Sequence, residues 1–485
     1  MKERILGKLM FVLLFALLLS CCRKAAEEDL LIDDGEIFPS TETTEMASDQ
    51  ETAESSAAAD EPEGYFLDVP DVPAEDMPLF KTYGNFAEDS SYLYFINGAT
   101  GTDLGFFTAA DKATGELIPL CTREGCTHSD RLCMACVGNS QWDILGMGRA
   151  GKKLYFAKNT NGMAIAIRSV DLTRCEYCLD EGKVDISPYF STSGGFNSFM
   201  NPSGRFFRGD YYFSMLQLKG DWSGSTGEFS IPSEFDYRAV SAIYGFRDKE
   251  VSEIISSVYE NWNMGSFWTL PDQDHVYSLI HLYRQDTEEE ERRSAEGEED
   301  PFIPIESTLI LSVWDRESRT EKEVYREEIE FYPSDCALYD GKILMLGRSS
   351  LDEEETVLAE LDLESLKYSE KKIVQAGAEN EIIDMTRFDA EGPVFVSMTD
   401  VSVPGTKLLR MQIQQMDLSG NAVQTSFSDI ELTFSDLPHI QYLGSDSAYL
   451  YFYVWEYEEQ NSNKALWSRL AAVPKNGGQA VIFGE

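Results

Sequence analysis

Short apolar runs alternate with polar turns along most of the chain, and this pattern predicts β-strands rather than helices. The recurring unit is a hairpin, in which an apolar strand leads through a small polar turn into a second strand. The copy at Leu466 to Phe483 reads LWSRLAAVPKNGGQAVIF. Similar turns, most of them introduced by an Asp, follow six earlier apolar runs, which end at Ala109, Val170, Phe246, Trp314, Leu361 and Met416. The sequence therefore repeats one hairpin seven times.

A further short strand precedes each hairpin. These strands include Leu93, Leu154, Tyr211, Val276, Ile343, Val394 and Leu450, at steps of 51 to 67 residues. Another apolar segment precedes most of them, so each unit offers four strands. Four-stranded units repeated at a period of roughly 40 to 50 residues or more are typical of a β-propeller, whose neighbouring sheets bury each other's faces. The sequence predicts an all-β fold, with a β-propeller of seven four-stranded blades in residues 81–485.

The residues before this region predict export and membrane anchoring. Residues 1–20 combine three basic residues with an apolar run at 9–19, which is shorter than the roughly 20 residues of a membrane span and is typical of a secretory signal. The string Leu18-Leu19-Ser20-Cys21 resembles the lipobox of bacterial lipoproteins, which implies that Cys21 is lipidated. Cys22 is the weaker choice. The alternative is an ordinary secretory signal followed by two cysteines without a role.

An acidic segment follows the signal. Residues 25–80 contain 18 Asp and Glu and no Lys or Arg. Such a segment cannot bury enough apolar surface to offset the entropy of ordering, and its like charges extend it. We therefore expect residues 21–80 to consist of the lipidated Cys and a disordered tether. Together with the signal, this predicts an extracytoplasmic protein held at the outer face of the cell membrane.

Charge limits the classes of partner. The chain has 40 Lys and Arg against 85 Asp and Glu. Without the first 80 residues, 35 basic and 66 acidic residues remain, a net charge of −31. Nucleic acid is excluded as a natural partner, because binding it requires a basic surface. Cationic or neutral ligands, glycans or divalent ions fit better, although acidity also simply keeps an exported protein soluble.

Two insertions interrupt the repeat. Gln285 to Pro304 is almost purely charged and is expected to be solvated. Gln217 to Tyr237 is rich in Gly and Ser and carries four aromatic residues, Trp222, Phe229, Phe235 and Tyr237. Aromatic side chains on a loop over a propeller rim can hold sugars or peptides. The alternative is that these rings fold back onto the edge of the blade.

The most chemically distinctive segment is PLCTREGCTHSDRLCMAC. It places Cys121, Cys126, His128, Cys133 and Cys136 between the predicted first and second blades. Cys121, Cys126, His128 and Cys133 would suffice for a tetrahedral zinc site. Disulfides are the alternative that we favour at this stage, because thiols of exported proteins tend to oxidise. In either case we expect the cluster to be structural and to fasten the first blade to the second.

Two resemblances extend this interpretation. The lipobox, the acidic tether and the string from Cys121 to Ala135 resemble a group of uncharacterised surface lipoproteins from Gram-positive, clostridia-like anaerobes. The hairpin at residues 466–483 resembles the repeat of TolB-like and YWTD-like propellers, with Asn476 in place of the usual Asp. The resemblance implies a surface-anchored propeller and brings no catalytic residues with it.

The sequence gives little support for an enzyme. The sequence lacks Gly-x-Ser-x-Gly, His-Glu-x-x-His and phosphate-loop motifs, and His275, His281 and His439 are isolated, as structural histidines are. We therefore expect no cofactor other than zinc, and a ligand-binding or protein-interaction scaffold with a glycan, peptide or protein ligand. The alternative is a glycan-active hydrolase or lyase with carboxylates in the propeller channel.

Overall fold

The computed structural model describes much of the chain from Phe66 onwards. The described residues are 66–73, 86–98, 102, 104–138, 144–160, 164–186, 196–198, 203–219, 236–245, 249–260, 262–285, 292, 304–349, 356–373, 381–389, 392–401, 407–432, 439–457 and 465–484. The chain divides into two units, Met1–Gly64 and Tyr65–Glu485, and all described residues belong to the second. Within them, no helix combines the length and the apolar character needed to cross a membrane.

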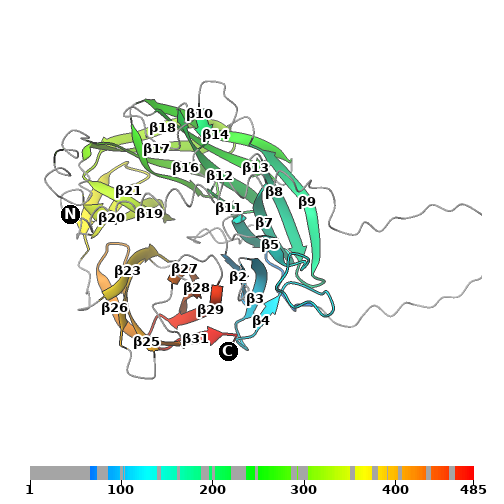
Figure 1. The fold of residues 1–485 in the computed structure, drawn as a ribbon. Helices are drawn as coiled ribbons and strands as arrows, with labels where there is room; N and C mark the ends of the chain where they lie inside the picture. The colour runs from blue at the N-terminus through cyan, green and yellow to red at the C-terminus, as the bar shows by residue number, and fades with distance from the viewer. Residues whose placement is uncertain are drawn as a thin grey trace, which may run out of the picture. The chain divides into compact units, whose positions relative to one another are not determined.

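The second unit is a seven-bladed β-propeller, as the sequence predicted. Its strands form seven separate sheets, each built on four antiparallel strands taken in chain order. The sheets follow one another around a ring, from blade 1 to blade 7 (Figure 1). The first strands of several neighbouring blades contact each other, as β1 does with β6 and β6 with β11. The first strands therefore lie innermost in the ring, while the last strands form the outer rim.

Each blade takes its strands from one continuous stretch of chain, apart from an additional strand in blade 6. The strands of blades 1 to 3 are β1 (Phe86–Glu88), β2 (Tyr92–Gly98), β3 (Gly105–Asp111), β4 (Leu117–Pro119) and β5 (Cys136–Gly138); β6 (Ile144–Ala150), β7 (Lys153–Thr160), β8 (Ala164–Asp171) and β9 (Glu176–Asp185); and β10 (Phe196–Ser198), β11 (Ser203–Phe207), β12 (Asp210–Lys219), β13 (Asp236–Gly245) and β14 (Glu250–Glu260). 

The strands of blades 4 to 7 are β15 (Asn263–Pro271), β16 (His275–Gln285), β17 (Pro304–Asp315) and β18 (Thr320–Glu328); β19 (Phe331–Tyr339), β20 (Lys342–Ser349), β21 (Thr356–Asp362) and β22 (Tyr368–Lys372); β23 (Glu381–Phe388), β24 (Pro393–Asp400), β25 (Lys407–Met416), β26 (Ala422–Leu432) and the added strand β30 (Gly478–Gln479); and β27 (His439–Ser445), β28 (Tyr449–Tyr457), β29 (Ala465–Pro474) and β31 (Val481–Phe483).

The predicted hairpins join the third and fourth strands of the blades, and an Asp caps the turn in five of them. In blade 1, Asp111 Oδ1 accepts hydrogen bonds from the backbone N–H groups of Ala113 and Thr114. The equivalent carboxylates also accept backbone N–H groups two to four residues later; they belong to Asp171, Asp315, Asp362 and Asp417. An Asp side chain that bonds its own backbone in this way favours a tight turn. This explains why the repeat was visible in the sequence.

A second Asp turn joins the first and second strands in three blades, and sequence reasoning missed it. Asp89 accepts the backbone N–H groups of Ser91 and Tyr92 and the hydroxyl of Tyr94. Two further aspartates, Asp272 and Asp446, make the same three kinds of hydrogen bond. The signal is present in the sequence as an Asp followed five residues later by a Tyr. Its carboxylate links the turn to a ring that lies in or beside the blade core.

Residues 66–73, which the sequence assigned to the tether, are docked against blade 2. Leu67 and Val69 are buried, and the N–H groups of Phe66 and Leu67 donate to backbone carbonyls at the β8–β9 turn. Val72 pairs with Gly151 in an isolated bridge. The folded part therefore begins earlier than residue 81. Apolar residues spaced two apart, as Leu67 and Val69 are, point to the same side of an extended segment and can be buried together even within an acidic stretch.

Candidate metal centre

The cysteine-rich segment forms the outer edge of blade 1. After β4, the chain leaves the sheet at Leu120, runs through a loop and returns as β5. Strand β4 pairs with β3 at Thr108–Ala110, and β5 pairs with the same strand at Gly105 and Phe106. The loop therefore leaves and re-enters its own blade, so it does not simply cross to the next one. Both of its ends are fixed by one strand.

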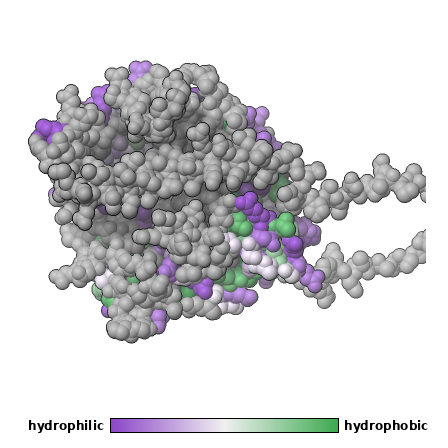
Figure 2. Space-filling view, in the orientation of Figure 1, coloured by the Kyte–Doolittle hydropathy of each residue, from purple (hydrophilic) through white to green (hydrophobic). Residues whose placement is uncertain are grey.

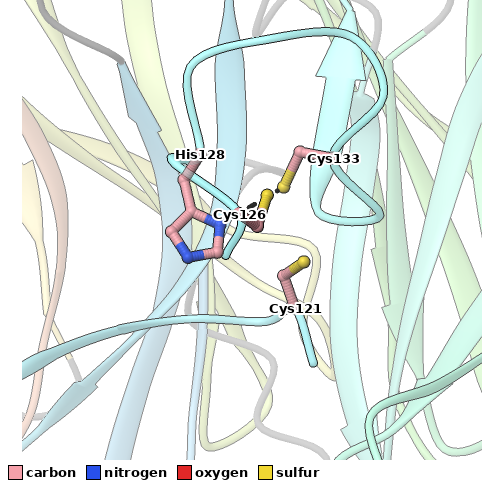
Figure 3. Close-up of side chains that lie close together, drawn as sticks. All are labelled: Cys121, Cys126, His128 and Cys133. Carbon is pink, nitrogen blue, oxygen red and sulfur yellow. Dashed lines mark hydrogen bonds between the residues drawn. The ribbon is translucent and has the colours of Figure 1, made fainter. Parts of the chain in front are cut away.

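Four side chains of this loop converge on one point. One ligand atom from each of Cys121, Cys126, His128 and Cys133 lies within 4.8 Å of every other, and Figure 3 shows the three sulfur atoms and the imidazole directed towards one another. His128 Nδ1 lies 3.4 Å from Cys133 Sγ. In the described part of the chain, this is the one group of His, Cys, Asp or Glu side chains that could hold a metal ion. The structure thus brings together all four residues that the sequence proposed for zinc.

The loop backbone is shaped to make this convergence. His128 has a φ of 51° and Gly125 a φ of 69°, both in the left-handed region, which a residue other than Gly adopts infrequently. The two reversals bring Cys126 and His128 back towards Cys121. Two tight turns close the remainder of the loop, with Cys126 N–H donating to Arg123 O and Cys133 N–H donating to Asp130 O. The four side chains are therefore positioned by backbone conformation and not only by their own contacts.

The thiols differ in their surroundings. Cys121 and Cys133 are buried, whereas Cys126 and His128 are half-buried. Burial raises the pKa of Cys133. Burial acts in the same direction on Cys121, but hydrogen bonds from the backbone N–H groups of Arg123 and Met134 and from the thiols of Cys133 and Cys126 outweigh it and hold the pKa of Cys121 below its ordinary value.

The β8–β9 turn of blade 2 packs directly against the cluster. Cys175, at a φ of 56°, is buried in the same core cluster as Cys121 and Cys133, and burial raises the pKa of its thiol to about 12. Tyr177 donates its hydroxyl proton to Leu120 O at 2.7 Å. The cluster therefore lies at the seam between blades 1 and 2, as the sequence suggested.

The remaining cysteines stand apart from the four. Cys136 begins β5 and Cys178 lies in β9, both half-buried, while Cys336 is buried in the core of blade 5. All seven cysteines in the described part of the chain are free thiols. The disulfides favoured from sequence stay a prediction that thiol counting tests. Disulfides among these cysteines would give the His128 imidazole no role.

Most of the other predicted site residues lie outside the described part of the chain. Cys21 lies outside the described residues, as do Trp222, Phe229 and Phe235. Tyr237 belongs to β13, where its backbone pairs with Leu218 and Tyr259. The ligand-loop hypothesis therefore stays a prediction.

The innermost strands carry a group of charged residues that sequence reasoning missed. Asp335 in β19 is 8% exposed and interacts electrostatically with Arg387 of β23 and Arg205 of β11. Burial raises the pKa of this carboxyl and lowers that of the Arg205 guanidinium. Three different blades supply these residues, so no local sequence signal could have grouped them.

The histidines named from sequence have structural environments. His281 is buried, with its Nε2 2.7 Å from Ser307 Oγ, and burial lowers its pKa to about 4. The ring of His439 stacks on Trp455. His275 lies 3.8 Å from both Asp272 and Asp315 at the edge of blade 4.

Comparison with known proteins bears on the fold alone. No protein-family model matches the chain, and no curated protein matches it. An acylaminoacyl peptidase in complex with Z-Gly-Gly-Phe-chloromethyl ketone aligns at 11% identity over 84% of this chain and 52% of its own, with a TM-score of 0.44. Pyrococcus horikoshii acylaminoacyl peptidase aligns at 11% identity over 81% and 51%, with a TM-score of 0.42.

The β-propeller domain of the Trilobed protease from Pyrococcus furiosus aligns at 11% identity over 81% of this chain and 95% of that domain, with a TM-score of 0.40. The chain spans about half the length of the two acylaminoacyl peptidases that it matches. Similarity at this level does not transfer their peptidase activity.

Proposed function

We propose that this chain is a lipoprotein of the extracytoplasmic face of the cell membrane, whose propeller binds a ligand or a partner protein as a scaffold. The observation that carries the proposal is the order of parts along the chain. A lipobox-like string ending at Cys21 and an acidic segment precede a propeller. A lipid on Cys21 would hold the propeller near the membrane, and the acidic segment would be repelled by an anionic membrane surface.

The channel supports a binding role over the glycan-active alternative. Glycoside hydrolysis uses two carboxyl groups about 5 to 9.5 Å apart. Asp335 is the one buried carboxylate on the described side chains of the innermost strands, and two arginines, Arg387 and Arg205, interact with it. His281, with its pKa lowered to about 4, is a poor general base near neutral pH.

The ligand surface proposed from sequence is the insertion between β12 and β13. Its aromatic residues Trp222, Phe229 and Phe235 suit stacking against a sugar or an apolar peptide side chain. Elsewhere, exposed large apolar side chains lie singly on the outer strands, such as Leu179, Val258 and Phe427, and hydrophilic and hydrophobic residues are interspersed over the described surface in view (Figure 2). Isolated residues of this kind do not define a docking surface.

Membrane fractionation tests the proposed localisation. We expect the full chain to sediment with membranes, the Cys21→Ser variant to appear in the medium or to stay unprocessed, and the matched Cys22→Ser variant to behave like the parent. A Cys21→Ser variant that fractionates as the parent does would exclude the anchor.

Ligand screening tests the role. Binding to immobilised glycans or peptides that is lost in a Trp222→Ala variant would support the scaffold. Turnover of chromogenic glycosides that is lost in an Asp335→Asn variant would instead support the glycan-active alternative.

A further inference from the structure

We propose that Cys121, Cys126, His128 and Cys133 bind one zinc ion, and that this ion locks the outer edge of blade 1 at its seam with blade 2. Three thiolates and one imidazole form a complete ligand set for tetrahedral zinc. The proposal rests on how these four side chains are placed, and it replaces the disulfides that the sequence alone favoured.

The spacing of the donor atoms fits a common metal ion. With zinc–ligand bonds of about 2.0 to 2.3 Å, neighbouring ligands of a tetrahedron lie roughly 3.3 to 3.8 Å apart. The four donor atoms all lie within 4.8 Å of one another, and the separation of His128 Nδ1 from Cys133 Sγ is 3.4 Å. A disulfide would instead bring one pair of sulfur atoms to about 2.05 Å and would leave the third thiol of the group without a partner.

His128 is the residue that distinguishes the two chemistries. Its backbone adopts a left-handed conformation, with a φ of 51°, and this turns the imidazole towards the three sulfurs instead of into solvent. A non-glycine residue in this region costs free energy, and a disulfide would gain nothing from it. A metal ion would, because the imidazole supplies the fourth ligand.

Hydrogen bonds from the loop backbone also suit thiolate ligands. The N–H groups of Arg123 and Met134 are directed at the sulfur of Cys121, and that of Ala135 at the sulfur of Cys133. Hydrogen bonds to the ligands orient them and stabilise their negative charge around a metal ion.

The site would be structural and not catalytic, because four protein ligands leave no open position for water or substrate. Its effect would be to fix the loop between β4 and β5. That loop carries Leu120, whose carbonyl accepts the Tyr177 hydroxyl from blade 2, so ordering the loop also orders the seam.

Metal analysis of the full chain tests the proposal. We expect one zinc per chain in protein purified without added metal, and loss of that zinc in the Cys133→Ser variant. The matched control is Cys175→Ser, which changes an adjacent buried thiol outside the ligand set and should keep one zinc. We expect His128→Cys, which supplies a sulfur in place of the imidazole as fourth ligand, to retain zinc, and His128→Ala to bind it more weakly.

Two further measurements keep the test decisive where a variant fails to fold. Removing zinc from the parent protein with a chelator should expose three additional thiols to a thiol reagent. Refilling the site with Co²⁺ should give the visible absorption of tetrahedral cobalt with thiolate ligands. The proposal is overturned by a chain that carries no zinc, by disulfides among Cys121, Cys126 and Cys133 in peptide mass spectra, or by equal zinc loss in the Cys175→Ser and Cys133→Ser variants.

Discussion

Removing the buried cation at the seam between blades 1 and 2 should destabilise the propeller strongly. The guanidinium of Arg149 is 1% exposed and its Nε lies 3.0 Å from Asp89 Oδ2, which is equally buried. Its remaining N–H groups donate to the carbonyls of Gly151, Lys153 and Pro70. One side chain therefore joins the Asp turn of blade 1, the first hairpin of blade 2 and the docked segment 66–73. An Arg149→Met substitution would preserve much of the volume and remove all four hydrogen bonds.

The cost follows from leaving Asp89 buried without its cation. Breaking a buried ion pair from one side typically costs about 3 to 5 kcal/mol. Unfolding entropy is about 2.1 cal/mol/K per residue, so for the unit Tyr65–Glu485 this loss corresponds to a fall in Tm of about 3 to 6 °C if the unit unfolds cooperatively. Scanning calorimetry of the parent and the variant measures the shift.

The chain offers a matched control. Arg410 makes a bidentate pair with Asp429, at 2.8 and 3.0 Å, but its side chain is 46% exposed. Solvent screens surface pairs of this kind, so Arg410→Met should lower Tm much less than Arg149→Met does. If Arg149→Met shifts Tm as little as Arg410→Met does, the buried ion pair and the four hydrogen bonds of Arg149 contribute little to the stability of the propeller.

Two further predictions concern pH and close packing. The folded state of the protein holds the pKa of His281 at about 4, against 6.5 for an unperturbed His, so the unfolded chain takes up the proton first and stability is lost as the pH falls from about 6.5 to 4. Over this window, the free energy of unfolding of the parent should therefore fall by about 3 kcal/mol more than that of a His281→Gln variant. Denaturant unfolding at several pH values measures both, and equal losses would contradict the lowered pKa of His281. In β20, a Cβ on Gly347 would lie 1.9 Å from the backbone oxygen of Tyr332. Gly347→Ala should thus cost about 1 to 3 kcal/mol, and an unchanged Tm would argue against this close approach.

The number of blades was predictable because the turns that define them are local. An Asp whose carboxylate bonds the backbone N–H groups two to four residues later, as Asp111 and Asp417 do, encodes its own turn. Alternating apolar residues on either side then specify the strands. The candidate metal site was recognisable for the same reason, since its four residues lie within 13 residues of one another.

What the sequence could not indicate depends on contacts between distant segments. Strand β30 pairs in parallel with β26 of the preceding blade, and the segment around Val72 pairs with Gly151. Both are short and neither has a strong apolar period. The partners of Asp335 in the channel come from β11 and β23. Only the closed ring brings these residues together, so neither composition nor spacing marks them.

The ring closes between blade 7 and blade 1 without a shared strand among the described residues. Blade 1 takes its described strands from residues 86–138 and blade 7 from residues 439–483, so no described strand from one end of the chain completes the blade at the other. The seam between them has a backbone hydrogen bond from the Gly484 N–H to Gly115 O. It is otherwise held by side chains, including the Tyr453 hydroxyl, which accepts the Gly98 N–H at 2.8 Å, and a Lys112–Asp446 ion pair at 3.6 Å. Side-chain contacts of this kind are weaker than a shared strand with its ladder of hydrogen bonds. On its other side, blade 1 is joined to blade 2 by the buried Arg149–Asp89 ion pair and by the hydrogen bond from Tyr177 to Leu120 O at the start of the cysteine-rich loop.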